Sequence, residues 1–101
     1  MNQREAKEIL DSIVAGYHKK TYAELAQLID GDIGVFHVYG ESGTKYEIEI
    51  DVFWDEENEK NIRFDAILDT GIFSSLFPMR ETFIKSPDNE FIEEEYEKPL
   101  F

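Results

Sequence analysis

The spacing of apolar residues changes once along this chain, near residue 33, and that change limits the fold more than any other feature. Before it, apolar residues recur every three or four positions, the period of an amphipathic helix. After it they alternate with polar residues, the period of a half-buried strand. Helices followed by strands is the order of an α+β domain. We therefore predict two N-terminal helices packed on a four- to five-stranded antiparallel meander sheet, in a single domain over residues 1–101.

Capping patterns mark the two helices. Asn2 is followed three residues later by Glu5, and Thr21 is followed by Glu24, which is the spacing of a capping box. Gly31 suits the left-handed position that ends a helix. The apolar faces of the helices are predicted to comprise Ala6, Ile9, Leu10, Ile13, Val14 and Tyr17, and then Leu25, Leu28 and Ile29.

The segment from Lys45 to Trp54 is the clearest strand in the chain. Its alternation predicts a buried face and a solvent-facing face that carries carboxylates. The buried face would hold Tyr46, Ile48, Ile50, Val52 and Trp54. Further strands are predicted over 33–40, 62–69, 80–86 and 91–92, and residues 93–101 are expected to form a loose acidic tail.

A large negative charge is concentrated in the strand region. The formal net charge is −13, of which residues 1–30 contribute −1 and residues 31–101 contribute −12. Such a surface repels phosphate backbones, so direct nucleic-acid binding is not expected. It suits either general solvation or the attraction of a basic protein partner.

Composition narrows the class of protein further. The chain has no cysteine, which excludes disulfides and thiolate metal sites. It has no run of about 18 apolar residues that could span a membrane. Its first ten residues lack the apolar segment of a secretory signal, so we expect a cytoplasmic protein.

Asp69-Thr70-Gly71 matches the catalytic turn of an aspartic protease, in which two such turns share one proton. We reject that interpretation. Bulky Ile72 and Phe73 follow the glycine, whereas small residues are usual there in that family. Only 30 residues follow Gly71, too few for the rest of a protease half. An ordinary turn at the end of a strand explains the same residues.

Two groups of residues are candidates for a functional site. The first is a carboxylate face on neighbouring strands, which is either a solvated side of the sheet or a docking surface for a basic partner. The second is a pocket between the helices and the sheet, with a polar and aromatic lining. The carboxylate face would consist of Glu47, Glu49, Asp51 and Asp65, and the pocket lining of His37, Tyr46, Trp54 and Asp69.

No metal site or cofactor is expected. Residues 55–59 are rich in carboxylates but lack the glycine and the ligand spacing of a calcium loop. His18 lies at a helix end, where a cation suits the helix dipole. No glycine-rich phosphate loop is present in the sequence.

Several short motifs in the second half of the chain occur in one order and spacing. These motifs are Gly40-Glu41-Ser42-Gly43-Thr44-Lys45-Tyr46, Val52-Phe53-Trp54-Asp55, Ile67-Leu68-Asp69-Thr70-Gly71, Phe77-Pro78, Phe83-Ile84-Lys85-Ser86-Pro87-Asp88 and Phe91-Ile92-Glu93-Glu94. As a set they resemble a family of small uncharacterised bacterial domains. Members typically carry Asp-Asp-Gly-Gly-Trp in place of residues 69–73 and glycine in place of Asn89. The resemblance implies a fold but no activity.

These observations favour a non-enzymatic protein-binding module, for example an inhibitor or a toxin-immunity protein, whose partner is a basic protein. Two alternatives stay open. One is a small-molecule-binding domain or enzyme that uses the pocket between helices and sheet, and the other is a nucleic-acid mimic. Exposed edge strands in such a sheet would also allow a homodimer.

Overall fold

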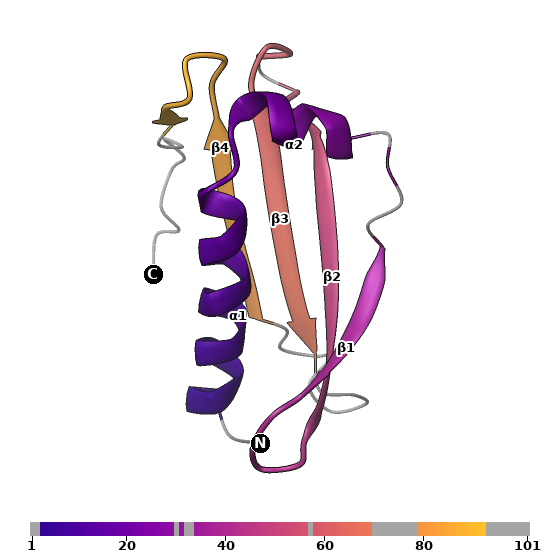
Figure 1. Cartoon of the computed structure of the whole chain (residues 1–101). Helices are drawn as coiled ribbons and strands as arrows, with labels where there is room; N and C mark the ends of the chain where they lie inside the picture. The colour runs from indigo at the N-terminus through magenta and orange to yellow at the C-terminus, as the bar shows by residue number, and fades with distance from the viewer. Residues whose placement is uncertain (1–2, 30, 32–33, 57, 70–78, 93–101) are drawn as a thin grey trace, which may run out of the picture.

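A five-stranded antiparallel sheet and two helices make up the part of the chain that the structure describes. The computed structural model describes residues 3–29, 31, 34–56, 58–69 and 79–92. The elements, in order, are α1 (Gln3–His18), α2 (Tyr22–Leu28), β1 (Val35–Tyr39), β2 (Lys45–Trp54), β3 (Ile62–Asp69), β4 (Met79–Lys85) and β5 (Phe91–Ile92). Each strand pairs antiparallel with the next (Figure 1), so the predicted α+β fold is confirmed.

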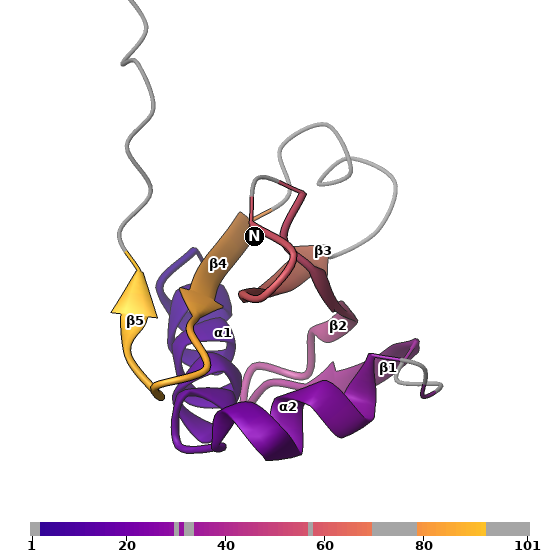
Figure 2. The same ribbon diagram turned by 90° about the horizontal axis from the view of Figure 1, so that it is seen from above.

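Both helices lie on one face of the sheet. α1 runs along the strands and packs on β3 and β4, whereas α2 crosses one end of the sheet and packs on β2 and β3 (Figures 1 and 2). β1 lies at the sheet edge, to the side of both helices. The sheet therefore has an inner face, turned toward the helices, and an outer face, turned away from them.

The core forms where α1 meets the middle of the sheet. Ala6, Leu10 and Val14 of α1 are buried, as the helical spacing predicted. On the sheet, the ring of Phe64 stacks on Phe83, with 4.7 Å between ring centroids. The alternation of β2 is confirmed for Tyr46, Ile48, Ile50 and Val52, which are all buried.

The capping box of α2 is confirmed in detail. The Glu24 amide donates to the Thr21 hydroxyl at 3.1 Å, and the Thr21 amide donates to the Glu24 carboxylate at 2.8 Å. These bonds satisfy backbone groups that the first turn of a helix leaves unpaired. Asn2, the predicted cap of α1, and the predicted acidic tail lie outside the described residues.

Trp54 is the exception on the buried face. It shares the inner side of β2 but remains 44% exposed, because it is the last residue of the strand. Tyr22 of α2 covers it in part, with 6.4 Å between ring centroids.

We predict that Phe64→Ala lowers the free energy of unfolding by about 3–5 kcal/mol, since it removes a fully buried ring and leaves a cavity. Tyr39→Ala, at a residue that is 68% exposed, should change it by less than about 0.5 kcal/mol. Urea unfolding of both variants measures the difference. Equal losses in the two variants would contradict this account of the core.

Candidate protein-binding surface

The predicted carboxylate face is present on the sheet. The strand register places two pairs of its carboxylates directly opposite one another. Glu47, Glu49 and Asp51 are exposed on the outer side of β2. The register places Asp51 opposite Asp65 and Glu47 opposite Asp69. Asp65 and Asp69 are half-buried on the same side of the sheet. Sequence reasoning assigned Asp69 to a different site, because strand register cannot be read from one strand.

Like charges placed directly opposite each other weaken a sheet. Four basic residues of the described strands share the outer face, His37, Lys45, Arg63 and Arg80, and they compensate its five carboxylates only in part. The Nε2 atom of His37 lies 3.5 Å from the Glu47 carboxylate, and the Arg63 guanidinium lies 3.5 Å from Asp55, in the loop that follows β2. The outer face therefore keeps a net negative charge, which suits a cationic partner.

The four residues predicted to line a pocket do not converge. Tyr46 is fully buried on the inner face, whereas Trp54 lies at the other end of β2, about 27 Å away along the strand. His37 and Asp69 lie on the outer face, on either side of Glu47. The prediction grouped residues from both faces of the sheet, because chemical type does not reveal on which side a residue lies.

Tyr46 instead belongs to a polar contact that joins α1 to the turn between β1 and β2. The Glu5 carboxylate accepts hydrogen bonds from the Ser42 hydroxyl at 2.6 Å, the Tyr46 hydroxyl at 2.7 Å and the Ser42 amide at 3.0 Å. These bonds lower the pKa of the Glu5 carboxyl, with the bond from the Ser42 hydroxyl contributing most. Gly40 passes so close that a Cβ there would overlap the carboxylate.

The turn itself explains the sequence motif that covers residues 40–46. Gly43 has a φ of 89°, in the region that favours glycine, and the Ser42 hydroxyl oxygen accepts a hydrogen bond from the Thr44 amide at 3.3 Å. The motif residues therefore shape this turn and anchor α1.

A second motif, residues 83–88, also anchors the helices to the sheet. Lys85 is buried, and its ammonium group donates to the Lys20 carbonyl oxygen at 2.6 Å, between the two helices. Beside it, Asn89 has a φ of 64° and accepts a hydrogen bond from the Tyr22 amide at 2.7 Å. Asparagine is one of the few residues apart from glycine that tolerate this conformation.

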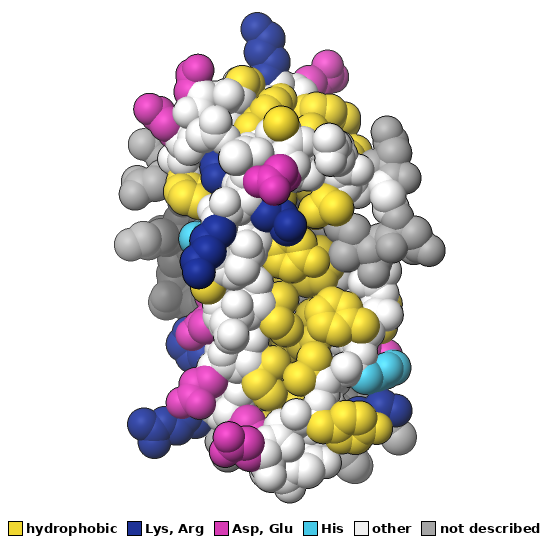
Figure 3. Space-filling model, viewed as in Figure 1, with side chains coloured by type: hydrophobic (Ala, Val, Ile, Leu, Met, Phe, Trp, Pro, Cys, Tyr) yellow, Lys and Arg dark blue, Asp and Glu magenta, His cyan; other side chains and the backbone are white. Residues whose placement is uncertain are grey.

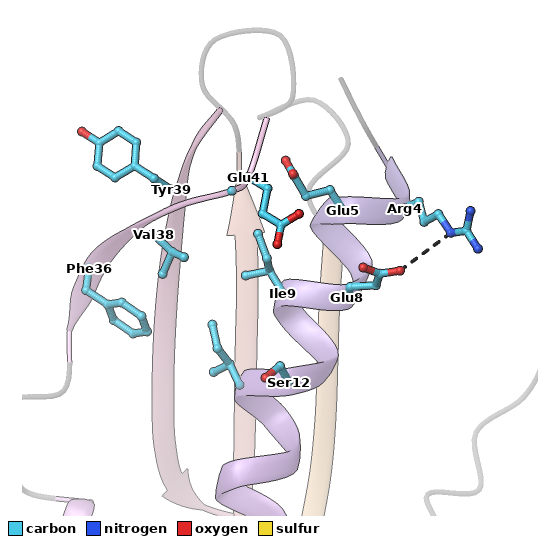
Figure 4. Close-up of a pocket in the computed structure, with 11 residues that line it drawn as sticks. Arg4, Glu5, Glu8, Ile9, Ser12, Phe36, Val38, Tyr39 and Glu41 are labelled. Atoms are coloured by element: carbon cyan, nitrogen blue, oxygen red, sulfur yellow. Dashed lines mark ion pairs between the residues drawn. The ribbon is translucent and has the colours of Figure 1, made fainter. Parts of the chain in front are cut away.

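An apolar groove, which the sequence prediction missed, separates α1 from β1. It has a volume of about 580 Å³ and a floor of Ile9 and Ile13 from α1 and of Phe36 and Val38 from β1. Figure 3 shows hydrophobic side chains gathered beside α1, and Figure 4 shows Phe36, Val38 and Ile9 turned toward one another. The rim is charged, with Glu8, Glu41 and Arg4, which pairs with Glu8 at 3.7 Å.

The sequence did contain a signal for this groove. β1 carries apolar residues on both of its sides, unlike β2, whose outer side is mostly acidic. In the structure Val35 is 51% exposed, Phe36 36% and Tyr39 68%. A strand that is apolar on both sides and remains exposed is the expected form of an interaction edge.

An acid pair lies at the interface of α1 and β4. The pKa of Glu81 is raised, first by burial and then by a hydrogen bond shared with Asp11. The pKa of Asp11 is lowered, first by that bond and then by Lys7, whose ammonium lies 3.1 Å away. The two shifts have opposite directions, so a proton shared by this pair resides on Glu81 rather than on Asp11.

Three further predictions concern a metal ion, a membrane span and the turn at residues 69–71. Among the described residues, no three carboxylate or histidine side chains form a group suited to a metal ion, and no described helix could cross a membrane. Asp69 ends β3, but Thr70 and Gly71 lie outside the described residues, so the turn assigned to them stays a prediction.

Comparisons with protein-family models, with curated proteins and with solved structures found no match to this chain. The resemblance to a family of small bacterial domains therefore stays a prediction.

We predict opposite effects of alanine at two glycines. Gly16→Ala, in α1 with open space around the added methyl, should raise the free energy of unfolding by about 0.5–1 kcal/mol. Gly40→Ala should lower it, because the methyl displaces the Glu5 carboxylate from Ser42 and Tyr46. Urea unfolding measures both. In a Glu5→Ala background the cost of Gly40→Ala should largely vanish, and a cost that persists would contradict the assigned clash.

The acid pair predicts a pH dependence of stability. The pKa of Glu81 is raised in the folded state. Its contribution to the stability of the protein is therefore complete below the ordinary pKa of 4.5, and is lost as the pH rises through the folded-state pKa. Glu81→Gln keeps a neutral donor at every pH, so the variant should gain stability relative to the wild-type protein as the pH rises above 4.5. Urea midpoints across this range test it. A stability difference between the two proteins that does not change with pH would contradict a raised pKa of Glu81.

Proposed function

We propose that this protein is a non-enzymatic binding module that recognises a basic protein in the cytoplasm. One observation carries the proposal: a sheet edge, β1, has an apolar groove on one side and a carboxylate face on the other. Apolar contacts at the centre of an interface supply affinity, and complementary charge around them steers the partner. An inhibitor or an immunity protein that occupies a basic surface of its target is a concrete form of this function.

The charges of the chain support a basic partner. The net charge is −13, and the exposed acids Glu47, Glu49 and Asp51 lie in one row on β2, with Glu47 and Glu49 directly opposite residues of β1. The rim of the groove adds Glu8 and Glu41. A cationic surface would be attracted from a distance and would meet carboxylates on both sides of the edge.

The test is affinity capture with the immobilised protein from a lysate of the source organism. We expect a basic protein to be retained in a fixed ratio at low salt and released at ~0.5 M salt, where screening weakens surface ion pairs. The combined variant Glu47→Gln, Glu49→Gln and Asp51→Asn should lose this protein.

The matched control is the combined variant Glu56→Gln, Glu59→Gln and Asp88→Asn. It removes the same number of charges from exposed positions in the loops that follow β2 and β4. It should retain the partner. Equal losses in the two variants, or no basic protein retained by the wild-type chain, would refute the proposal. Competition by double-stranded DNA for the captured protein would identify the carboxylates as a nucleic-acid mimic.

The groove supports a second candidate, the binding of a small apolar molecule. Its volume lies within the range of about 300–1,000 Å³ that is usual for ligand sites. A compound screen that follows the melting temperature would reveal such a ligand, and Ile9→Glu should abolish its effect.

A further inference from the structure

We infer that the partner binds by β-strand addition: an extended basic segment pairs with the free edge of β1, with apolar side chains on the inner side and Lys or Arg on the outer side. This inference rests on the proposed function and specifies how the partner is recognised. Strand addition combines main-chain hydrogen bonds, which supply affinity, with alternate side chains, which supply specificity.

The backbone of β1 offers the required hydrogen bonds. At its two ends the Ile50 amide donates to the Gly34 carbonyl at 3.1 Å, and the Gly40 amide donates to the Thr44 carbonyl at 2.9 Å. In an antiparallel pair such bonds recur at every second residue, so Phe36 and Val38 direct their backbone groups toward β2.

The intervening residues of β1 direct their backbone groups the other way. Val35, His37 and Tyr39 present three amides and three carbonyls to the free edge. Within the described part of the chain, β1 is the terminal strand of the sheet, and no turn or loop hydrogen bond uses these groups. A row of such groups is a template for another strand.

The inner side of an added strand would meet apolar surface. Directly opposite residues share one side of a sheet, so partner residues opposite Phe36 and Val38 would point toward the helices. There they would extend the apolar surface of the groove (Figure 4). Ile9 and Ile13 of α1 form the other side of that groove. This position favours Val, Ile or Leu in the partner.

The outer side of an added strand would meet carboxylates. Partner residues opposite Val35 and His37 would lie about 10 Å from β2, two strand spacings away, within reach of long side chains. Across β1 from them lie Glu49, the register partner of Val35, and Glu47, the partner of His37. This position favours Lys or Arg.

Charge selects a basic segment over a second copy of this chain. Two copies joined through β1 would each carry a net charge of −13, and β1 contains neither Lys nor Arg to offset it. A foreign segment with alternating cations has the opposite sign on the side that faces Glu47 and Glu49. The occupant is therefore a basic strand of another protein.

The probe is a fluorescent seven-residue peptide that alternates Lys and Val, titrated with the full-length protein and followed by anisotropy. It should bind at least tenfold more tightly than a peptide of the same composition with all Lys first, and more tightly than a peptide that alternates Glu and Val. Equal binding of the alternating and block-ordered Lys peptides, or no binding of the alternating one, would overturn the inference.

Backbone pairing is tested with two N-methylated versions of the alternating peptide. In an antiparallel orientation the Lys amides would face β1, so methyl groups on all Lys amides block pairing. In a parallel orientation the Val amides would face β1, so methyl groups on all Val amides block it. One version should lose at least tenfold in affinity while the other binds as the parent peptide does. Equal affinities of the two versions would overturn strand addition, whatever their value.

The matched protein variants act on His37. Its amide points to the free edge, so His37→Pro removes an edge donor and leaves the β1–β2 ladder intact, as proline permits on an edge strand. His37→Pro should lose at least tenfold in peptide affinity, whereas His37→Ala, which keeps the amide, should lose much less. Circular dichroism and melting curves confirm that both variants fold. Equal affinities of the two folded variants would overturn the inference.

The outcomes separate this inference from the function on which it rests. One outcome is capture of a basic protein that requires Glu47, Glu49 and Asp51 and yet is unchanged by His37→Pro. That outcome would leave the proposed function intact and refute strand addition. A concentration-dependent dimer in sedimentation velocity that His37→Pro abolishes would show that the edge serves self-association, and would refute it also.

Discussion

The architecture depends on how little of the sheet two short helices can cover. Neighbouring strands lie about 4.8 Å apart, and a helix with its side chains is about 10–12 Å across. α1 has 16 residues and covers β3 and β4, and α2 has seven and crosses one end. β1 lies beyond them. Phe36 is therefore 36% exposed, whereas its register partner Ile48 is fully buried.

Polar contacts at both ends of α1 hold it in this position. Near its N-terminus, Glu5 accepts hydrogen bonds from Ser42 and Tyr46. Just past its C-terminus, buried Lys85 donates to the Lys20 carbonyl. A shift of α1 toward β1 would break these bonds and leave polar groups of Tyr46 and Lys85 buried without partners, which is costly. The groove beside β1 is thus a consequence of where these contacts anchor the helix.

Local patterns predicted the elements well, and the candidate site less well. The capping box of Thr21 and Glu24 and the alternation of β2 depend on neighbours within a few residues, and the sequence shows those directly. The grouping of His37, Tyr46, Trp54 and Asp69 failed for the opposite reason. These residues meet or separate according to strand register and sheet side, and residue type carries no information on either.

The sequence by itself determined the order of helices and strands, the buried side of β2 and the acidic character of its other side. Each of these follows from a period of two or of 3.6 residues. Only the tertiary structure decided that Asp51 faces Asp65, that Glu5 reaches across to Ser42 and that β1 keeps a free edge beside an apolar groove. These depend on how distant segments align and on which strands the helices cover, and packing of the whole chain sets both.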